Sequence, residues 1–221
     1  MKHNWNFSSV FAYWDVLLIG LSGTVTLFAI TCIAGLSGGL VIGMLRYSKN
    51  KWMSYPARLY VEVFRNTPVL VQIIWFFFAM PVVIGVEISA FMAAFLGITL
   101  NTAAFSAEVF RGGIQSIERE QWEAGKAIGM NYGATMRRII LPQALKRMLP
   151  PLTSRGIEVF KMSTLASVVA YPETLQQAKL IASYEYNPIE TYTIVALMFF
   201  LVLLPMVQLT YLLERRFGKA D

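Results

Sequence analysis

The chain has 221 residues, of which 56% are hydrophobic and 14% charged, and its formal net charge is +6. Soluble domains carry roughly a quarter charged residues, so this composition predicts an integral membrane protein. One cysteine, Cys32, and one histidine, His3, exclude an intrachain disulfide, a zinc cluster and a Cys-His or Ser-His catalytic pair. The cations lie beside apolar segments, which favours the positive-inside effect over nucleic-acid binding.

Residues 1–15 are polar and aromatic and are expected to lie at the membrane interface. The first predicted span covers residues 16–45, too long for a signal-peptide core. Gly35, Gly39 and Gly43 recur every four residues and predict a flat stripe for close helix packing. At about 1.5 Å per residue the span exceeds a hydrocarbon core of roughly 30 Å, so it is tilted, broken near Gly20 to Gly23, or projects beyond the bilayer.

Residues 46–58 contain four cations and no acid, which predicts a cytosolic linker and an external N-terminus. The second membrane element has a polar half, residues 59–67, and an apolar half after Pro68. The proline predicts a kinked helix. A short external hairpin follows around Gly85 to Glu87, which has no Lys or Arg.

Three further spans are predicted, at residues 88–110, 148–171 and 188–213. Seven cations place the loop at residues 111–147 in the cytosol. Residues 172–187 are expected outside the membrane, and Pro205 is expected to kink the last span. Arg215, Arg216 and Lys219 place the C-terminus in the cytosol. The fold class is therefore all-α integral membrane with five spans.

The cytosolic loop begins with an amphipathic pattern between Ile117 and Ile128, with Gly125 and Gly129 four residues apart. The thin side of such a helix can accept a partner's surface closely. A short interfacial helix lying flat in the headgroups would show the same periodicity. The pattern alone leaves both interpretations open.

The loop resembles the signature of binding-protein-dependent ABC importer permeases, which is E-A-A, three residues, G, nine residues and I-x-L-P. It reads here Glu123-Ala124-Gly125, then Gly129, then Ile139 to Pro142, with both spacings kept. The phrases VEVFRNTPVLVQ at 61–72 and LNTAAFSAEVFRGGIQSI at 100–117 are similar to the polar amino acid branch of that family. The resemblance covers residues 60–216.

The resemblance implies a type I importer permease in the bacterial inner membrane, with residues 1–221 as one transmembrane domain and residues 112–147 as a cytosolic coupling loop. It implies a second permease subunit, the same chain or a related one, a dimeric ABC ATPase and an extracytoplasmic solute-binding protein. The chain has no phosphate-binding G-x-x-x-x-G-K-[ST] loop, so ATP and magnesium are expected on the ATPase and this subunit is not an enzyme. The residues implied in coupling to the ATPase are Glu123, Ala124, Gly125, Ala127, Gly129, Leu141 and Pro142.

The loop departs from the family pattern at two positions. Many members have Pro and Gly where this chain has Glu118 and Glu120, so its helix is expected to start earlier, with acids at its positive end. Small side chains at Ala124, Gly125 and Gly129 are expected to permit close approach of a partner. Pro142 is expected to stop a second short helix before the next span.

The fourth predicted span contains Arg155, Glu158 and Lys161 at three-residue steps. Charges within a span cost roughly 2.5 to 3.5 kcal/mol each and are kept where they face a cavity or a partner. Arg155 could meet a substrate carboxylate and Glu158 an ammonium group. An ion ladder, or pairs with Glu62 or Glu108, would explain them structurally. Further candidates for the substrate path, each also explained by hydrogen bonds between helices, are Asn101, Thr102, Ser163, Thr164 and Gln72.

These features together predict a permease that imports a polar amino acid by alternating access. In some related importers of basic amino acids an acid occupies the position of Arg155, so the arginine favours acidic or amide substrates, with basic amino acids as the alternative. An ion-coupled secondary carrier is disfavoured by the lack of an inverted repeat. A membrane enzyme is disfavoured by the lack of a nucleophile-base pair or metal-ligand cluster.

Overall fold

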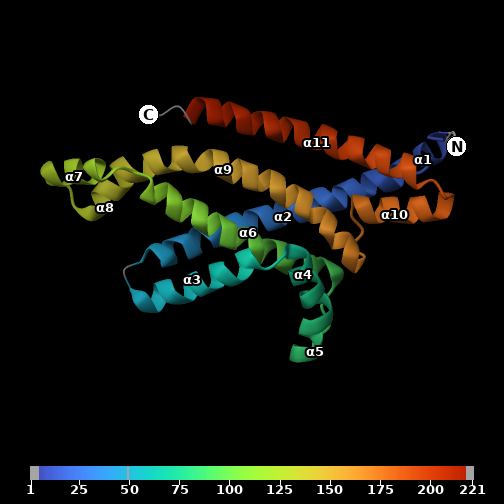
Figure 1. The fold of residues 1–221 in the computed structure, drawn as a ribbon, viewed down its shortest axis with the longest axis horizontal. Helices are drawn as coiled ribbons and strands as arrows, with labels where there is room; N and C mark the ends of the chain where they lie inside the picture. Colours follow the sequence, from blue (N-terminus) through green and yellow to red (C-terminus); the bar gives the residue numbers. More distant parts are fainter. Residues whose placement is uncertain (1–4, 49, 218–221) are drawn as a thin grey trace.

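The longest helix of the computed structural model, which describes residues 5–48 and 50–217, is α2, Trp14–Tyr47. It follows the short α1, Ser8–Phe11, and packs along α6, Ala90–Gln115 (Figure 1). A Cβ atom on Gly35 would lie 2.6 Å from Cγ2 of Thr102, and one on Gly39 2.5 Å from Cβ of Ser106. The predicted glycine stripe is confirmed as the contact between α2 and α6.

Of the three alternatives for the long first span, the break near Gly20 to Gly23 does not occur, because α2 is continuous through both residues. A Cβ atom on Gly20 would lie 2.9 Å from Cα of Thr174, and one on Gly23 2.8 Å from the carbonyl oxygen of Pro172. These glycines therefore allow the segment at the start of α10 to pack closely against α2, and they do not interrupt the helix. With 34 residues, about 51 Å at the α-helical rise, α2 must tilt or extend beyond the hydrocarbon core.

The predicted linker at residues 46–58 is mostly helical. Helix α3, Lys51–Asn66, begins inside it, and the side chain of Asn50 caps the helix by accepting from the backbone N–H of Trp52. Lys49, one of the predicted cytosolic cations, lies outside the described residues, as do His3 and Lys219. The linker was predicted from its charges, which indicate the side of the membrane but not the secondary structure. Its amphipathic sequence and its capping asparagine favour a helix.

The second membrane element is broken rather than gently kinked. Helix α3 ends at Asn66, and after Pro68 the chain continues as α4, Val69–Ile74, the π-helical turn η1, Trp75–Ala79, and α5, Met80–Ile84. The bend between the two halves is 102°. Thr67 is extended, with φ −105° and ψ 130°, as expected of a residue before proline. Helix α5 then ends at Gly85, whose φ is 71°.

The predicted cytosolic loop contains α7, Arg119–Ala127, and α8, Tyr132–Thr135. The chain then continues as helix through the π-helical turn η2, Met136–Ile140, into α9, Leu141–Met162. The expectation that Pro142 stops a short helix is therefore wrong. Pro142 lies in the first turn of α9, where a missing N–H costs little, and Pro150 and Pro151 lie inside the same helix.

A 3₁₀ segment, η3, Ser163–Val169, ends α9. The predicted external segment contains α10, Thr174–Glu185, a helix that the sequence analysis missed, and the last helix is α11, Pro188–Phe217, in which Pro205 lies without interrupting it. Among the described residues, α2, α6 and α11 are long and apolar enough to span a membrane, and the bent pair α3 and α4–α5 would be a fourth span. Helix α9, with its five charged residues, does not meet that criterion, so the count of five spans stays a prediction.

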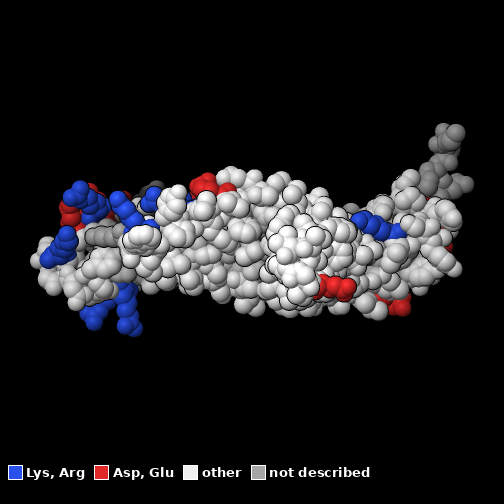
Figure 2. Space-filling view, turned by 90° about the horizontal axis from the view of Figure 1, so that it is seen from below, with Lys and Arg blue, Asp and Glu red and all other residues white. Residues whose placement is uncertain are grey.

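The described residues form an elongated molecule whose long helices run mostly along one axis (Figure 1). Helices α1 and α10 lie at one end, and α7 and α8 at the other, toward which α11 also runs. Figure 2 shows Lys and Arg side chains gathered at the end of α7 and α8, while the middle of this face is almost free of charge. An uncharged belt between charged ends is the pattern of a protein that crosses a bilayer.

Helix α10 is capped by a buried acid. The carboxylate of Glu173 accepts from the backbone N–H groups of Leu175 at 2.9 Å and Gln176 at 2.7 Å. Burial raises the pKa of this carboxyl to about 7. A neutral amide at this position is therefore a close substitute for the acid near neutral pH.

We expect Glu173→Ala to lower the free energy of unfolding by about 1 to 2 kcal/mol, because two buried N–H groups lose their acceptor. Glu173→Gln, which keeps one acceptor oxygen, should lose less. The midpoint of thermal unfolding in detergent measures both, with Glu87→Ala, a change of an exposed acid, as the control. Equal midpoints for Glu173→Ala and Glu87→Ala would show that the cap contributes nothing.

Candidate coupling surface and membrane polar cluster

The helix of the signature motif, α7, ends in a Schellman motif. The N–H of Gly129 donates to the carbonyl of Lys126 at 2.9 Å, and that of Met130 to the carbonyl of Gly125 at 3.0 Å. Gly129 has φ 77°, and a Cβ atom there would meet nothing within 4 Å. The glycine is thus needed for its left-handed backbone, which ends the helix, rather than for space.

Gly125 makes room inside the loop itself. It is buried, and a Cβ atom on it would lie 2.7 Å from Cγ2 of Thr135 in α8. The expectation that Gly125 leaves space for a partner is therefore wrong, because its missing side chain lets α7 pack on α8. The ring of Trp122 also stacks on that of Tyr132, with centroids 5.5 Å apart.

The opposite side of α7 is exposed, and it combines two small residues with charged ones. It presents Ala124 and Ala127, and Ile128 next to them is 73% exposed. Glu123 accepts from Nε of Arg119 at 2.8 Å, so this acid already has an exposed partner on its own helix. Helix α7 begins at Arg119, with Glu118 as the cap residue and Glu120 in its first turn.

The loop is anchored to the long helices through a small apolar cluster. Ile117, Ile140, Ala144 and Met148 are buried together, with Trp122 packed against them. Leu141 and Pro142, the last two residues of the signature, are exposed at the start of α9. Trp122 of α7 thus packs in one cluster with side chains of α6 and α9.

Within the predicted spans, Arg155 is almost completely enclosed, with 5% of its side chain exposed. Its Nη1 donates to Glu158 Oε2 and its Nη2 to Asn101 Oδ1, both at 2.7 Å. Its guanidinium lies 4.3 Å from the ring centre of Phe105. Lys161 is exposed and pairs with no residue that the structure describes, so the predicted ladder is limited to one pair.

Asn101 connects Arg155 to the break between α3 and α4. Its Nδ2 donates to the carbonyl oxygen of Phe64 at 2.7 Å. Nε2 of Gln72 donates to the same oxygen and to that of Thr67, both at 3.0 Å. These carbonyl oxygens have no backbone N–H partner because the helix is interrupted at Pro68. The side-chain amides of Asn101 and Gln72 donate to them instead.

The three other predicted path residues do not join Arg155. Thr102 lies at the contact with Gly35, and its hydroxyl is buried without a hydrogen-bond partner among the described residues. Ser163 donates to the carbonyl of Phe160 at 2.6 Å, and Thr164 to that of Lys161 at 2.8 Å. The structure thus brings together Arg155, Glu158, Asn101 and Gln72 only.

An open groove of about 410 Å³ lies beside this cluster. Glu158 borders it with 57% of its side chain exposed, and Glu214 of α11 borders it from another helix. The groove therefore presents two carboxylates, one of them paired with Arg155. It is lined by Phe105, Val109, Pro150, Pro151, Ser154, Arg155, Glu158 and Glu214.

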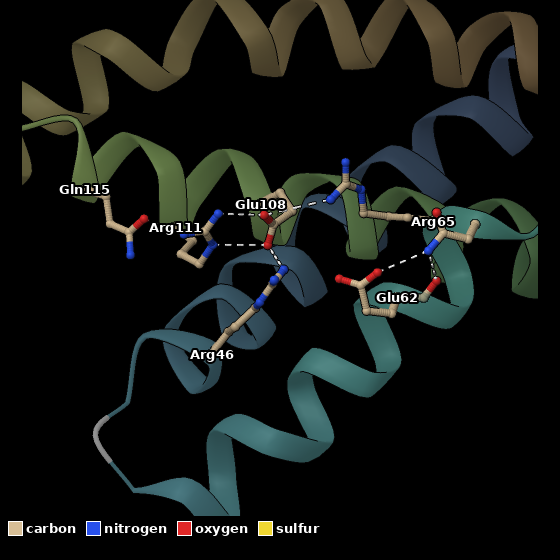
Figure 3. A network of polar contacts seen from close by, with 7 residues as sticks. Arg46, Glu62, Arg65, Glu108, Arg111 and Gln115 are labelled. Atoms are coloured by element: carbon tan, nitrogen blue, oxygen red, sulfur yellow. Dashed lines mark hydrogen bonds and ion pairs between the residues drawn. The ribbon is translucent and has the colours of Figure 1, made fainter.

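A second charged cluster is centred on Glu108 of α6 (Figure 3). Arg111 donates to both of its oxygens, at 3.2 and 2.8 Å, Arg46 of α2 forms an ion pair with it, and Nη1 of Arg65 of α3 lies 3.8 Å from it. The sequence analysis did not find this cluster. The spacing of Glu108 and Arg111 was a usable signal, but the other two arginines come from distant segments.

Removing the side-chain amide at the break should loosen α4. We expect Gln72→Leu to leave the carbonyl of Thr67 without a donor, at a cost of about 1 to 3 kcal/mol. Hydrogen–deuterium exchange of the backbone amides of residues 69–74 should become faster, while Gln208→Leu, which changes an exposed glutamine of α11, should not alter it. Unchanged exchange in Gln72→Leu would contradict a role of this amide in holding the break.

Comparison with known proteins adds three relatives. The family of binding-protein-dependent transport system inner membrane components matches residues 35–219. YckA of Bacillus subtilis (strain 168), a probable amino-acid ABC transporter permease, is 37% identical over 90% of this chain and 88% of its own. The glutamine transport system permease GlnP of Escherichia coli (strain K12) is 33% identical over 98% of both chains. The arginine transport system permease ArtQ of Bacillus subtilis (strain 168) is 30% identical over 99% of this chain and 100% of its own.

Two solved structures have the same fold. A crystal structure of an amino acid ABC transporter with histidines has a TM-score of 0.91 and 34% identity, and covers 97% of this chain and 100% of that one. An inward-facing structure of the MetNI methionine ABC transporter has a TM-score of 0.71 over 91% of this chain and 98% of that one. At 21% identity, the second likeness concerns the fold alone.

Proposed function

The chain belongs to the family of binding-protein-dependent transport system inner membrane components and is a permease subunit of an amino acid ABC importer, and from this premise we propose that it carries a polar amino acid into the cytoplasm by alternating access driven by a separate dimeric ATPase. In this proposal, residues 1–221 form one transmembrane domain. This domain pairs with a second permease subunit, the same chain or a related one, and receives substrate from an extracytoplasmic binding protein. ATP and magnesium are bound by the ATPase.

The coupling surface is the observation that carries this proposal. Helices α7 and α8 pack together through Gly125 and the Trp122 ring, and the exposed side of α7 includes the small residues Ala124 and Ala127. A partner that moves this pair of helices moves α6 and α9 with it. The cations at this end support a cytosolic position for residues 112–147 and for the C-terminus, with the N-terminus outside.

The polar cluster favours an amide side chain over an acidic one. Both Nη atoms of Arg155 are engaged by Glu158 and Asn101, and its Nε, which has no hydrogen-bond partner among the described residues, is buried, so the guanidinium presents no accessible pair of donors to a second carboxylate. Glutamine is the substrate named for GlnP. A basic amino acid is the second candidate, because Glu158 and Glu214 both border the groove and ArtQ is named for arginine.

Uptake in proteoliposomes tests the proposal. Vesicles containing the permease, its ATPase and the binding protein should accumulate labelled glutamine only when ATP reaches the ATPase, and unlabelled arginine and glutamate supplied in excess should compete less than glutamine. Accumulation driven by an ion gradient without ATPase would indicate a secondary carrier. Stronger competition by arginine would establish the basic substrate instead.

A further inference from the structure

Arg65, near the end of α3, is a guanidinium with unused donors. Its side chain is 38% exposed, and it lies 3.8 Å from Glu108 and 5.1 Å from the ring centre of Phe105. No residue that the structure describes accepts a hydrogen bond from it. A planar fork with free donors on a partly exposed side chain is suited to bind a carboxylate through two hydrogen bonds.

The charge around Arg65 is not balanced. Arg46, Arg65 and Arg111 all share the carboxylate of Glu108, and Arg111 alone engages both of its oxygens (Figure 3). Glu62, one turn before Arg65 on α3, adds a second acid near these arginines, so two negative charges face three positive ones. Unbalanced cations among membrane helices are expected where an anionic partner or a water-filled cavity meets them.

The same aromatic ring links Arg65 to the polar cluster. The guanidinium groups of Arg65 and Arg155 both lie against Phe105. They differ in what they can still bind, since Arg155 is 5% exposed with both Nη atoms engaged, whereas Arg65 is open. Along α6, Asn101, Phe105, Glu108 and Arg111 follow one another at helical spacing toward the α7 end.

We propose that Arg65 binds the α-carboxylate of the transported amino acid on the cytosolic side of the Arg155 cluster, as a second site on the exit path. The inference rests on the proposed import of an amino acid. Because the group recognised is the α-carboxylate, which all amino acids share, the site does not depend on the side chain of the substrate. Release to the cytosol follows when water replaces the guanidinium at this exposed position.

The test uses a cysteine reporter in the importer complex. Permease with Cys32→Ala and Glu62→Cys is assembled with its ATPase in nanodiscs without nucleotide or binding protein, and the rate of alkylation by N-ethylmaleimide is measured. The reporter lies on the exposed side of α3, one turn before Arg65. Excess L-glutamine should slow alkylation by about tenfold, as expected for hydrogen bonds to a charged group, whereas L-glutaminamide should not.

Arg65→Gln should abolish this protection and Arg65→Lys should retain part of it. Arg58→Gln, which removes the same charge two turns earlier on α3, should retain all of it. ATP hydrolysis checks that each variant has assembled, and Arg65→Lys carries the test if Arg65→Gln does not assemble.

Three results would overturn the proposal. These are protection that persists in Arg65→Gln, equal protection by glutamine and glutaminamide, and protection that requires phosphatidylglycerol in the nanodisc but no amino acid. The last would assign Arg65 to a lipid phosphate. Uptake by the unchanged permease in proteoliposomes is measured in parallel. If uptake occurs but glutamine gives no protection, the proposed exit site at Arg65 is wrong and the proposed import function is not affected.

Discussion

Replacing Ala127 by tryptophan is expected to lower ATP-driven uptake strongly while the permease stays folded in the membrane. Ala127 is exposed on α7, where the added ring would occupy the space of a closely packed partner. Overpacking of a close contact costs about 1 to 3 kcal/mol, so uptake should fall by about tenfold or more. Uptake and the stimulation of ATP hydrolysis by the binding protein, measured in the same proteoliposomes, report the loss.

The matched control is Lys146→Trp, which adds the same ring at an exposed position of α9 outside both α7 and α8. It should transport normally. Gly129→Trp would be a poorer test, because the φ of 77° at Gly129 makes any side chain disturb the end of α7 itself. Normal uptake by Ala127→Trp would show that this face is not where the ATPase acts.

The parts of the fold that could be predicted from the sequence are those set by short-range patterns. Gly35 and Gly39 predicted a close helix contact, and Pro68 the position at which the second membrane element changes direction. The 102° angle could not be derived, because it depends on which carbonyls at the break find new donors, here from Gln72 and Asn101. A proline fixes where a helix ends but not where the chain goes next.

The errors have the same physical origin. A break at Gly20 to Gly23 was one of three alternatives for the first span, since a glycine in a helix permits both a kink and a close contact, and the packing partner decides which occurs. Pro142 was interpreted as a stop, although a proline in the first turn of a helix is compatible with its continuation. Helix α10 lies in a segment whose polar residues gave no apolar period.

The candidate site was predictable residue by residue, but its connections were not. Arg155 and Glu158 are three residues apart and were recognised as a possible pair, whereas Asn101 is 54 residues from Arg155 in the chain. The sequence around Arg65 and Arg155 did not show which acceptors each guanidinium would meet in the fold. The Arg155 guanidinium is enclosed and hydrogen-bonded, whereas that of Arg65 is partly exposed. This difference depends on contacts with Asn101, Glu158 and Glu108 that form in the folded chain.

A double substitution at the polar cluster is expected to separate stability from transport. Arg155→Met leaves Glu158 and Asn101 without their donor and should lower the free energy of unfolding by about 2 to 3 kcal/mol, less than the roughly 3 to 5 kcal/mol of a fully buried pair, because water reaches Glu158. Arg155→Met combined with Glu158→Met removes both charges and should recover much of that loss, as apolar replacements of ion pairs often do.

Thermal unfolding of the two variants in detergent checks the recovery, and uptake is measured on the same preparations. If the stable double variant transports nothing, Arg155 and Glu158 act on the substrate and not only on the fold. If it transports normally, the pair is structural, and the polar groups that recognise the amino acid must lie elsewhere along the groove. Glu158→Gln with Arg155 retained distinguishes a requirement for the Glu158 charge from one for its hydrogen bond with Arg155, because the amide keeps the shape and one acceptor oxygen of the side chain without its charge.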